Sequence, residues 1–177
     1  MHLILVPGDA GGLRAALGGA HRRYTRQVNL REGWRGYLWQ GRFAAVAMDA
    51  PYLLAAARYV ELNPVRARMV EHPRNYRWSS YRAHAEGRED ALAQFHDAFR
   101  RLGRTVEERR KAYRELFAQK LDPAFVESLR AATNGGWALG SQRFAREIAR
   151  AAGRRAAPLP RGPKPAAAKD KRQLSLL

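Results

Sequence analysis

The stretch Tyr52–Val70 reads YLLAAARYVELNPVRARMV and places its apolar residues at helical spacing as far as a proline. On a helix with about 3.6 residues per turn, one broad apolar arc is filled by Leu53, Ala55, Ala56, Ala57, Tyr59, Val60 and Leu62. Arg58 and Glu61 fall outside that arc, on the side that can face water. Pro64 has no N–H to donate and restricts the residue before it, so the helix should end there. The spacing predicts an amphipathic helix at the centre of the fold.

One polar residue interrupts the apolar arc. Asn63 follows Tyr59 by four residues, so the two side chains share a face. Arg66 and Arg68 follow directly. One interpretation is a core tyrosine beside an asparagine that caps the helix. The other is a phenol and a carboxamide placed together for chemistry, with arginines nearby to contact phosphate.

The charge of the chain points to a polyanionic partner. Thirty-three Lys and Arg residues against sixteen Asp and Glu residues give a net charge of +17. Nucleic acid is the default partner for such a chain, and an anionic membrane surface is the alternative. A membrane is not expected, because no apolar run approaches the ~18 residues of a span and no signal segment is present. The absence of cysteine excludes disulfides and cysteine-based zinc sites, and the cytoplasm is the expected compartment.

Short apolar runs early in the chain predict a sheet. Residues 2–6 read HLILV and end at a proline, which suits a buried strand. Residues 37–48 read YLWQGRFAAVAM, and the aromatic and β-branched residues on either side of Gln-Gly predict a β-hairpin. Between these runs, apolar residues from Leu13 to Val28 recur at helical spacing. Residues 1–87 are therefore expected to form one α+β domain.

The second half of the chain has a helical pattern. A capping box at Thr105–Glu108, the pair Asp122–Pro123, and Ser141 each predict the start of a helix. Residues 88–153 should therefore form a helical extension. Residues 154–177 are rich in proline, alanine and basic residues and have few large apolar side chains, so they are expected to be a disordered basic tail.

The segment RNYRWSSYR at residues 74–82 alternates aromatic and basic side chains. This composition suits contact with phosphates and stacking on bases. A solvated surface with buried aromatic anchors would have the same composition, so the pattern leaves both interpretations open.

Three segments together resemble one protein family: GYLWQGRF at residues 36–43, RYVELNPVRA at 58–67 and YRWSSY at 76–81. They are similar to the HUH-type single-tyrosine transposases, and most of all to the REP-associated tyrosine transposases. The similarity continues more loosely through ATNGGWALGSQRF. The resemblance implies a ferredoxin-like HUH nuclease sheet with packed helices, here incomplete at its beginning.

The resemblance also implies a catalytic site. Tyr59 matches the nucleophile of the family, and His2 and Asn63 match two of the ligands of Mg²⁺ or Mn²⁺. In the family, the tyrosine attacks a DNA phosphate, stays linked to the 5′ end and releases a 3′ hydroxyl. The candidate DNA contacts are Arg35, Arg42, Arg58, Arg66 and Arg68.

The chain departs from the family pattern at its first residues. The family has two histidines that flank one apolar residue, and here His2 matches the second histidine and Met1 the apolar residue. The first histidine has no counterpart. We expect that the chain starts at an internal Met codon of a longer protein, and the alternative is a genuine truncation with a broken metal site. Tyr37 also stands where the family often has histidine.

These features predict a metal-dependent endonuclease and strand transferase that acts on single-stranded or hairpin DNA at repeated sequences, as a monomer or a homodimer. The alternative from another class is a catalytically inactive DNA-binding remnant or regulator. An RNA-binding helical protein would also suit the charge, but it would leave the pairing of Tyr59 with Asn63 unexplained.

Overall fold

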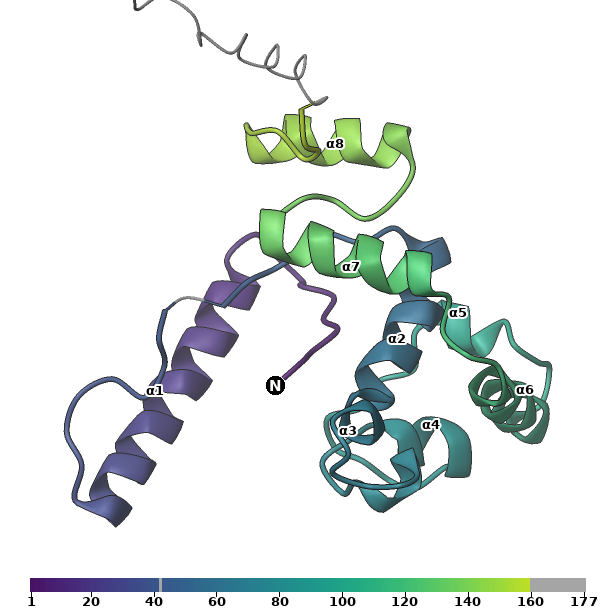
Figure 1. Ribbon diagram of the computed structural model, residues 1–177, viewed down its shortest axis with the longest axis horizontal. Helices are drawn as coiled ribbons and strands as arrows, with labels where there is room; N and C mark the ends of the chain where they lie inside the picture. The colour runs from purple at the N-terminus through teal and green to yellow at the C-terminus, as the bar shows by residue number, and fades with distance from the viewer. Residues whose placement is uncertain (42, 160–177) are drawn as a thin grey trace, which may run out of the picture.

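The structure is a computed structural model that describes residues 1–41 and 43–159. In this part of the chain, Figure 1 shows α2 to α6 gathered in one group, α7 at one end of α2, α8 beyond α7, and α1 standing apart. The elements in chain order are α1 (Gly12–Glu32), η1 (Ala50–Tyr52), α2 (Leu53–Glu61), α3 (Asn63–Arg66), η2 (Pro73–Asn75), α4 (Tyr81–Glu86), α5 (Asp97–Arg100), α6 (Val106–Ala118), α7 (Pro123–Gly135) and α8 (Gln142–Ala152), where η marks a 3-10 helix.

The expected α+β fold with a ferredoxin-like sheet is wrong, because the described residues are all-α and form no sheet. Residues 2–6 are not a strand, and their side chains are exposed. One isolated parallel bridge joins Met48 to Leu139. In it the Leu139 N–H donates to the Ala47 carbonyl (2.8 Å) and the Asp49 N–H donates to the Leu139 carbonyl (2.9 Å). A strand forms only where a neighbour satisfies its backbone groups, and apolar composition alone does not supply that neighbour.

The β-hairpin predicted at residues 37–48 is also wrong. Trp39 stacks on His21 of α1, with ring centroids 4.3 Å apart and planes inclined by 18°. Tyr24 of the same helix lies 6.0 Å from the Trp39 ring. The aromatic residue that favoured a strand therefore packs against a helix, and such packing outweighs β-propensity.

The helix predicted from the central stretch is confirmed. Asp49 Oδ1 accepts a hydrogen bond from the Ala50 N–H (2.8 Å) and opens η1, from which α2 continues. The helix ends at Glu61. Pro64 lies in the first turn of α3, where its missing N–H breaks no hydrogen bond. The proline therefore ends one helix, as predicted, and also begins a short one that the sequence pattern does not reveal.

The helix starts predicted after residue 88 are confirmed by their caps. At α6 the Thr105 hydroxyl accepts from the Glu108 N–H (3.1 Å) while the Glu108 carboxylate accepts from the Thr105 N–H (3.2 Å). Asp122 caps α7 and Ser141 caps α8 through their side-chain oxygens. Each cap satisfies N–H groups that have no partner within the helix.

Two apolar clusters hold the helices together. One lies between α4, α5 and α6 and is completed by Leu54 of α2. The other joins α7 and the loop after it to residues 46–59. Both clusters join residues from before and after residue 87, so the predicted helical extension packs onto the preceding segment. The buried members are Tyr81, Ala85, Phe99 and Tyr113 in the first cluster and Leu129, Ala132 and Leu139 in the second.

Glu61 was expected to face water, and this expectation is wrong, because its side chain is only 1% exposed. Its carboxylate accepts hydrogen bonds from the Ser80 hydroxyl (2.7 Å), from His84 Nδ1 (2.8 Å) and from the Tyr113 hydroxyl (2.8 Å). Burial, together with the nearby Glu61 carboxylate, raises the pKa of Tyr113. Ser80 lies before α4, His84 in α4 and Tyr113 in α6, and all three contact Glu61 of α2. Their hydrogen bonds satisfy the Glu61 carboxylate, which would otherwise be costly to bury.

The beginning of the predicted tail packs onto the fold. Ala156 is buried, and its carbonyl accepts a hydrogen bond from the Ala138 N–H (2.8 Å). Arg154 Nη1 donates to the Gly136 carbonyl (3.1 Å). Residues 154–159 therefore contact the loop between α7 and α8, whereas residues 160–177 of the predicted tail lie outside the described residues.

Candidate functional site

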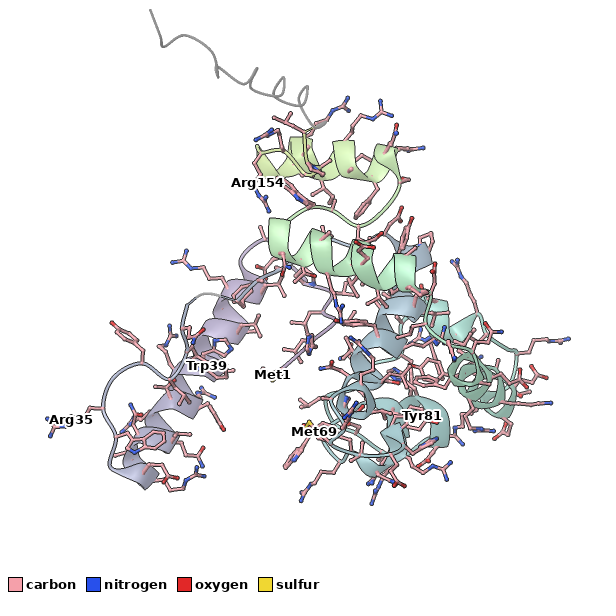
Figure 2. All side chains as sticks on the ribbon, in the orientation of Figure 1. Met1, Arg35, Trp39, Met69, Tyr81 and Arg154 are labelled. Atoms are coloured by element: carbon pink, nitrogen blue, oxygen red, sulfur yellow. The ribbon has the colours of Figure 1, made fainter. Side chains whose placement is uncertain are left out.

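Tyr59, His2 and Asn63, which the sequence pattern singles out, lie together. Tyr59 is in the last turn of α2, and Asn63 begins α3. The first residues bring His2 to them, and Figure 2 shows Met1 between α1 and the group of α2 to α6. The His2 and Tyr59 rings meet edge to face with centroids 6.3 Å apart, and Asn63 Nδ2 lies 3.3 Å from His2 Nδ1. His2 therefore contacts both of the other residues.

Two arginines flank the Tyr59 side chain. The guanidinium carbon of Arg66, in α3, lies 4.4 Å from the centroid of the Tyr59 ring, within the range of a cation–π interaction. Arg130, in α7, lies near the Tyr59 phenol and lowers its pKa. Both arginines are exposed and Tyr59 is half-buried, so the site is open to an incoming molecule.

The arginines favour the ionised form of Tyr59. Burial raises the pKa of the phenol, but the nearby guanidiniums of Arg130 and Arg66 outweigh this effect and leave the pKa lowered from its ordinary value. Partial desolvation lowers the pKa of His2, and the charges of the N-terminal amino group and Arg66 lower it further. Near neutral pH the site therefore combines a neutral imidazole with a phenol that ionises more readily than a free tyrosine.

An open pocket of about 540 Å³ adjoins this site. Arg66 and Arg130 form part of its wall, together with apolar residues of α7 and the segment before it. Two guanidiniums in one pocket suit an anion such as a phosphate group. The lining residues are Arg66, Leu121, Pro123, Val126, Glu127 and Arg130.

The residues around Tyr59 do not fit a site for Mg²⁺ or Mn²⁺. His2 and Asn63 supply two neutral donors, and residues 1–41 and 43–159 contain no group of three or more His, Cys, Asp or Glu side chains that could hold a metal ion. Both ions prefer oxygen ligands, which usually include carboxylates. Arg66 and Arg130 add positive charge, which repels a cation. The donor set therefore suits an anion better than a metal ion.

Arg58, a candidate DNA contact, is engaged inside the fold. Its Nη2 donates to the Gln119 carbonyl (2.6 Å), and its Nε is buried with no hydrogen-bond partner among the described residues. Desolvation lowers the pKa of Arg58, against the opposing effect of Tyr113. The guanidinium thus links α2 to the end of α6.

Arg68 and Arg35, two of the other candidates, lie in different loops. Arg68 is exposed after α3 and adopts a left-handed backbone conformation with φ of 57°. Arg35 lies in the loop after α1, and Figure 2 shows it at the edge of the molecule, far from Met1. Arg42 lies outside the described residues. Of the four candidates within the described residues, only Arg66 is brought to the Tyr59 ring.

Arg130 is a site residue that sequence reasoning missed. Its helix is recognisable from the Asp122–Pro123 start, but nothing in the local sequence distinguishes Arg130 from the other exposed arginines. It reaches Tyr59 because Phe125 and Leu129 of α7 pack in the same apolar cluster as Tyr59. Only the packing of α7 against α2 could reveal this contact.

Replacing Arg130 with methionine should raise the pKa of Tyr59. The change removes a nearby guanidinium that favours the phenolate, so the pKa of Tyr59 should move towards the ordinary tyrosine value of about 10. The measurement is an NMR titration of the chain with ¹³C-labelled tyrosine, with the Tyr59 signal assigned from Tyr59→Phe. Arg143→Met, which removes an exposed arginine from α8, is the control and should leave the titration unchanged. An unchanged Tyr59 titration in Arg130→Met would contradict the assigned contact.

The chain matches no protein-family model, no curated protein and no solved structure. Among the described residues, none of the helices combines the length and the apolar character needed to cross a membrane. The geometry at Tyr59 and the sequence pattern are therefore the basis for a functional proposal.

Proposed function

We propose that this protein is a DNA strand transferase of the tyrosine-transposase type, which cuts and rejoins single-stranded DNA next to a hairpin. The observation that carries the proposal is the position of the Tyr59 phenol beside Arg66 and Arg130, which line an open pocket and lower the pKa of the phenol. The resemblance of RYVELNPVRA to the family segment supports the same residue as the nucleophile. The proposed compartment is the cytoplasm, and the proposed active form is a monomer or a homodimer.

The proposed reaction exchanges one phosphate ester for another. The Tyr59 oxygen attacks the phosphorus, and a bond forms between the phenol oxygen and the 5′ phosphate. The bond from phosphorus to the 3′ oxygen breaks, and that oxygen takes up a proton and leaves as a 3′ hydroxyl. The phenol proton passes to solvent, since Tyr59 is only half-buried. Attack by a 3′ hydroxyl on the phosphotyrosine reverses these steps and joins two strands.

The two arginines have the charge that this reaction requires. Negative charge gathers on the phosphate oxygens as the phenolate attacks, and fixed guanidiniums stabilise it. Arg66 and Arg130 are the residues that would supply this stabilisation, because both line the pocket beside Tyr59. The net charge of +17 adds an attraction for DNA that does not depend on sequence and weakens with salt.

A second candidate function is DNA binding without cleavage. It is favoured by the donor set at Tyr59, in which His2 and Asn63 are the two candidate metal ligands. Within residues 1–41 and 43–159 no group of three or more His, Cys, Asp or Glu side chains could hold a metal ion. A protein of this kind would use the arginines at Tyr59 to bind phosphate and would form no covalent bond. It would act as a regulator of the DNA that it occupies.

The experiment that separates the two functions is a search for a covalent adduct. The chain is incubated with labelled single-stranded DNA that carries a hairpin, with Mn²⁺ in one reaction and EDTA in another, and is run on a denaturing gel. The strand transferase should give a labelled band that survives denaturation, and peptide mass spectrometry should place the phosphate on Tyr59. Bound DNA on a native gel without any adduct, over a range of hairpins, would support the binding function and reject the first proposal.

A further inference from the structure

The structure separates the aromatic residues of segment 74–82 into two kinds. Tyr81 is 2% exposed and packs edge to face on Phe117, with centroids 4.9 Å apart, so it is a core anchor. Trp78 is 73% exposed, which makes it the most exposed of the four tryptophans. The two interpretations of this segment therefore apply to different residues, and Trp78 is an exposed aromatic side chain without a role in the core.

The backbone next to Trp78 is held firmly. The Ser79 hydroxyl oxygen accepts a hydrogen bond from the Tyr81 N–H (3.2 Å), and the Ser80 hydroxyl donates to the buried Glu61 carboxylate (2.7 Å). Glu61 is in α2, the helix that carries Tyr59. Trp78 is therefore presented on an anchored loop that is tied to the helix of the proposed nucleophile.

Arginines are frequent in the sequence around Trp78, and one of them lies against its ring. The guanidinium carbon of Arg77 lies 4.3 Å from the centroid of the Trp78 ring and covers one of its faces. Residues 66–82 contain five arginines and one acidic residue, Glu71. Trp39 and Trp137 lack this setting, since Trp39 stacks on His21 and Trp137 packs against the α7 cluster.

We propose that Trp78, backed by Arg77, is a stacking platform for an unpaired base of single-stranded DNA. A base can stack on an exposed indole ring while nearby arginines contact the phosphates on either side. A cation on one face of the ring strengthens such a platform and keeps the ring in place. The inference rests on the proposed function, which identifies the partner as single-stranded DNA. It concerns how the strand is bound, and it does not require cleavage.

The test compares the affinities of three variants of the protein for two single-stranded DNA molecules. Each chain carries Tyr59→Phe, so that no cleavage occurs, and is otherwise wild type, Trp78→Ala or Trp34→Ala. Affinity is measured at one salt concentration for an oligothymidine and for an abasic strand of the same length, which has phosphates but no bases. Trp78→Ala should lose between about five-fold and a hundred-fold in affinity for oligothymidine and should keep its affinity for the abasic strand. Trp34, which is 59% exposed, is the matched control and should change neither affinity.

A second measurement does not depend on a variant. Irradiation of the wild-type chain with a strand that contains 5-bromouracil should crosslink the base to the peptide that contains Trp78. Unchanged affinity of Trp78→Ala for oligothymidine, or an equal loss on both strands, would overturn the platform, and so would crosslinks confined to other peptides. Base-dependent binding through Trp78 without any adduct at Tyr59 would support the platform and reject only the strand-transfer reaction.

Discussion

The Tyr59→Phe chain should form no covalent adduct with hairpin-tailed single-stranded DNA and should still bind that DNA. The variant lacks only the phenol oxygen, which is the atom proposed to attack the phosphorus, so the rate of adduct formation should fall by more than about 10³-fold. Arg66 and Arg130 remain in place to hold a phosphate, and the ring that contacts Arg66 is kept. Adduct formation and native-gel affinity, measured on the same samples, report the two properties separately.

Tyr24→Phe is the matched control for this experiment. Tyr24 is a 53% exposed tyrosine on α1, and its loss should leave the adduct yield unchanged. An adduct that persists in Tyr59→Phe would show that another residue is the nucleophile. A parallel loss of adduct and affinity would show instead that Tyr59 contributes to binding rather than to bond formation.

Replacing Glu61 with alanine should produce the largest loss of stability of any substitution proposed for this fold. The carboxylate is 1% exposed and accepts hydrogen bonds from Ser80, His84 and Tyr113. Its removal leaves three donors in the interior without their acceptor and opens a cavity. Removal of one partner from a buried charged network typically costs about 3–5 kcal/mol. The free energy of unfolding, measured by urea titration followed by circular dichroism, should fall by an amount in this range.

Glu86→Ala is the control, because it removes a carboxylate that is not buried. Glu86 ends α4 and lies 3.3 Å from Arg74 in an exposed ion pair, so its removal should cost less than about 1 kcal/mol. Similar losses of unfolding free energy in the two variants would contradict the stabilising role of Glu61 in the core. Because the Glu61–Ser80 hydrogen bond also anchors the loop of Trp78, Glu61→Ala should weaken binding to oligothymidine as well.

Several helix ends of this chain could be predicted, because they depend on neighbouring residues. Thr105, Asp122 and Ser141 accept hydrogen bonds from the first turns of α6, α7 and α8, as their positions in the sequence predict. Pro64 ends α2 for an equally local reason. The α5 helix is a single turn, Asp97–Arg100, whose N-cap His96 accepts a hydrogen bond from the Ala98 N–H.

The predicted strands failed for the opposite reason. A strand depends on a partner that is distant in the sequence, and the runs at residues 2–6 and 37–48 were assigned from their composition alone. In the structure Trp39 packs on His21, and Met48 forms one isolated bridge to Leu139. Neither contact can be inferred from the alternation of apolar residues.

The sequence by itself determined the central helix with its end, the starts of α6, α7 and α8, and that Tyr59 and Asn63 lie close together, since these features arise within a few residues of the chain. Only the tertiary structure decided which charged residues form a site and which form the core. Glu61 lies on the polar side of α2, yet His84 and Tyr113 from α4 and α6 enclose it. Arg130 reaches Tyr59 only through the packing of α7. The physical reason is that contacts between distant segments depend on how helices pack, which local spacing does not specify.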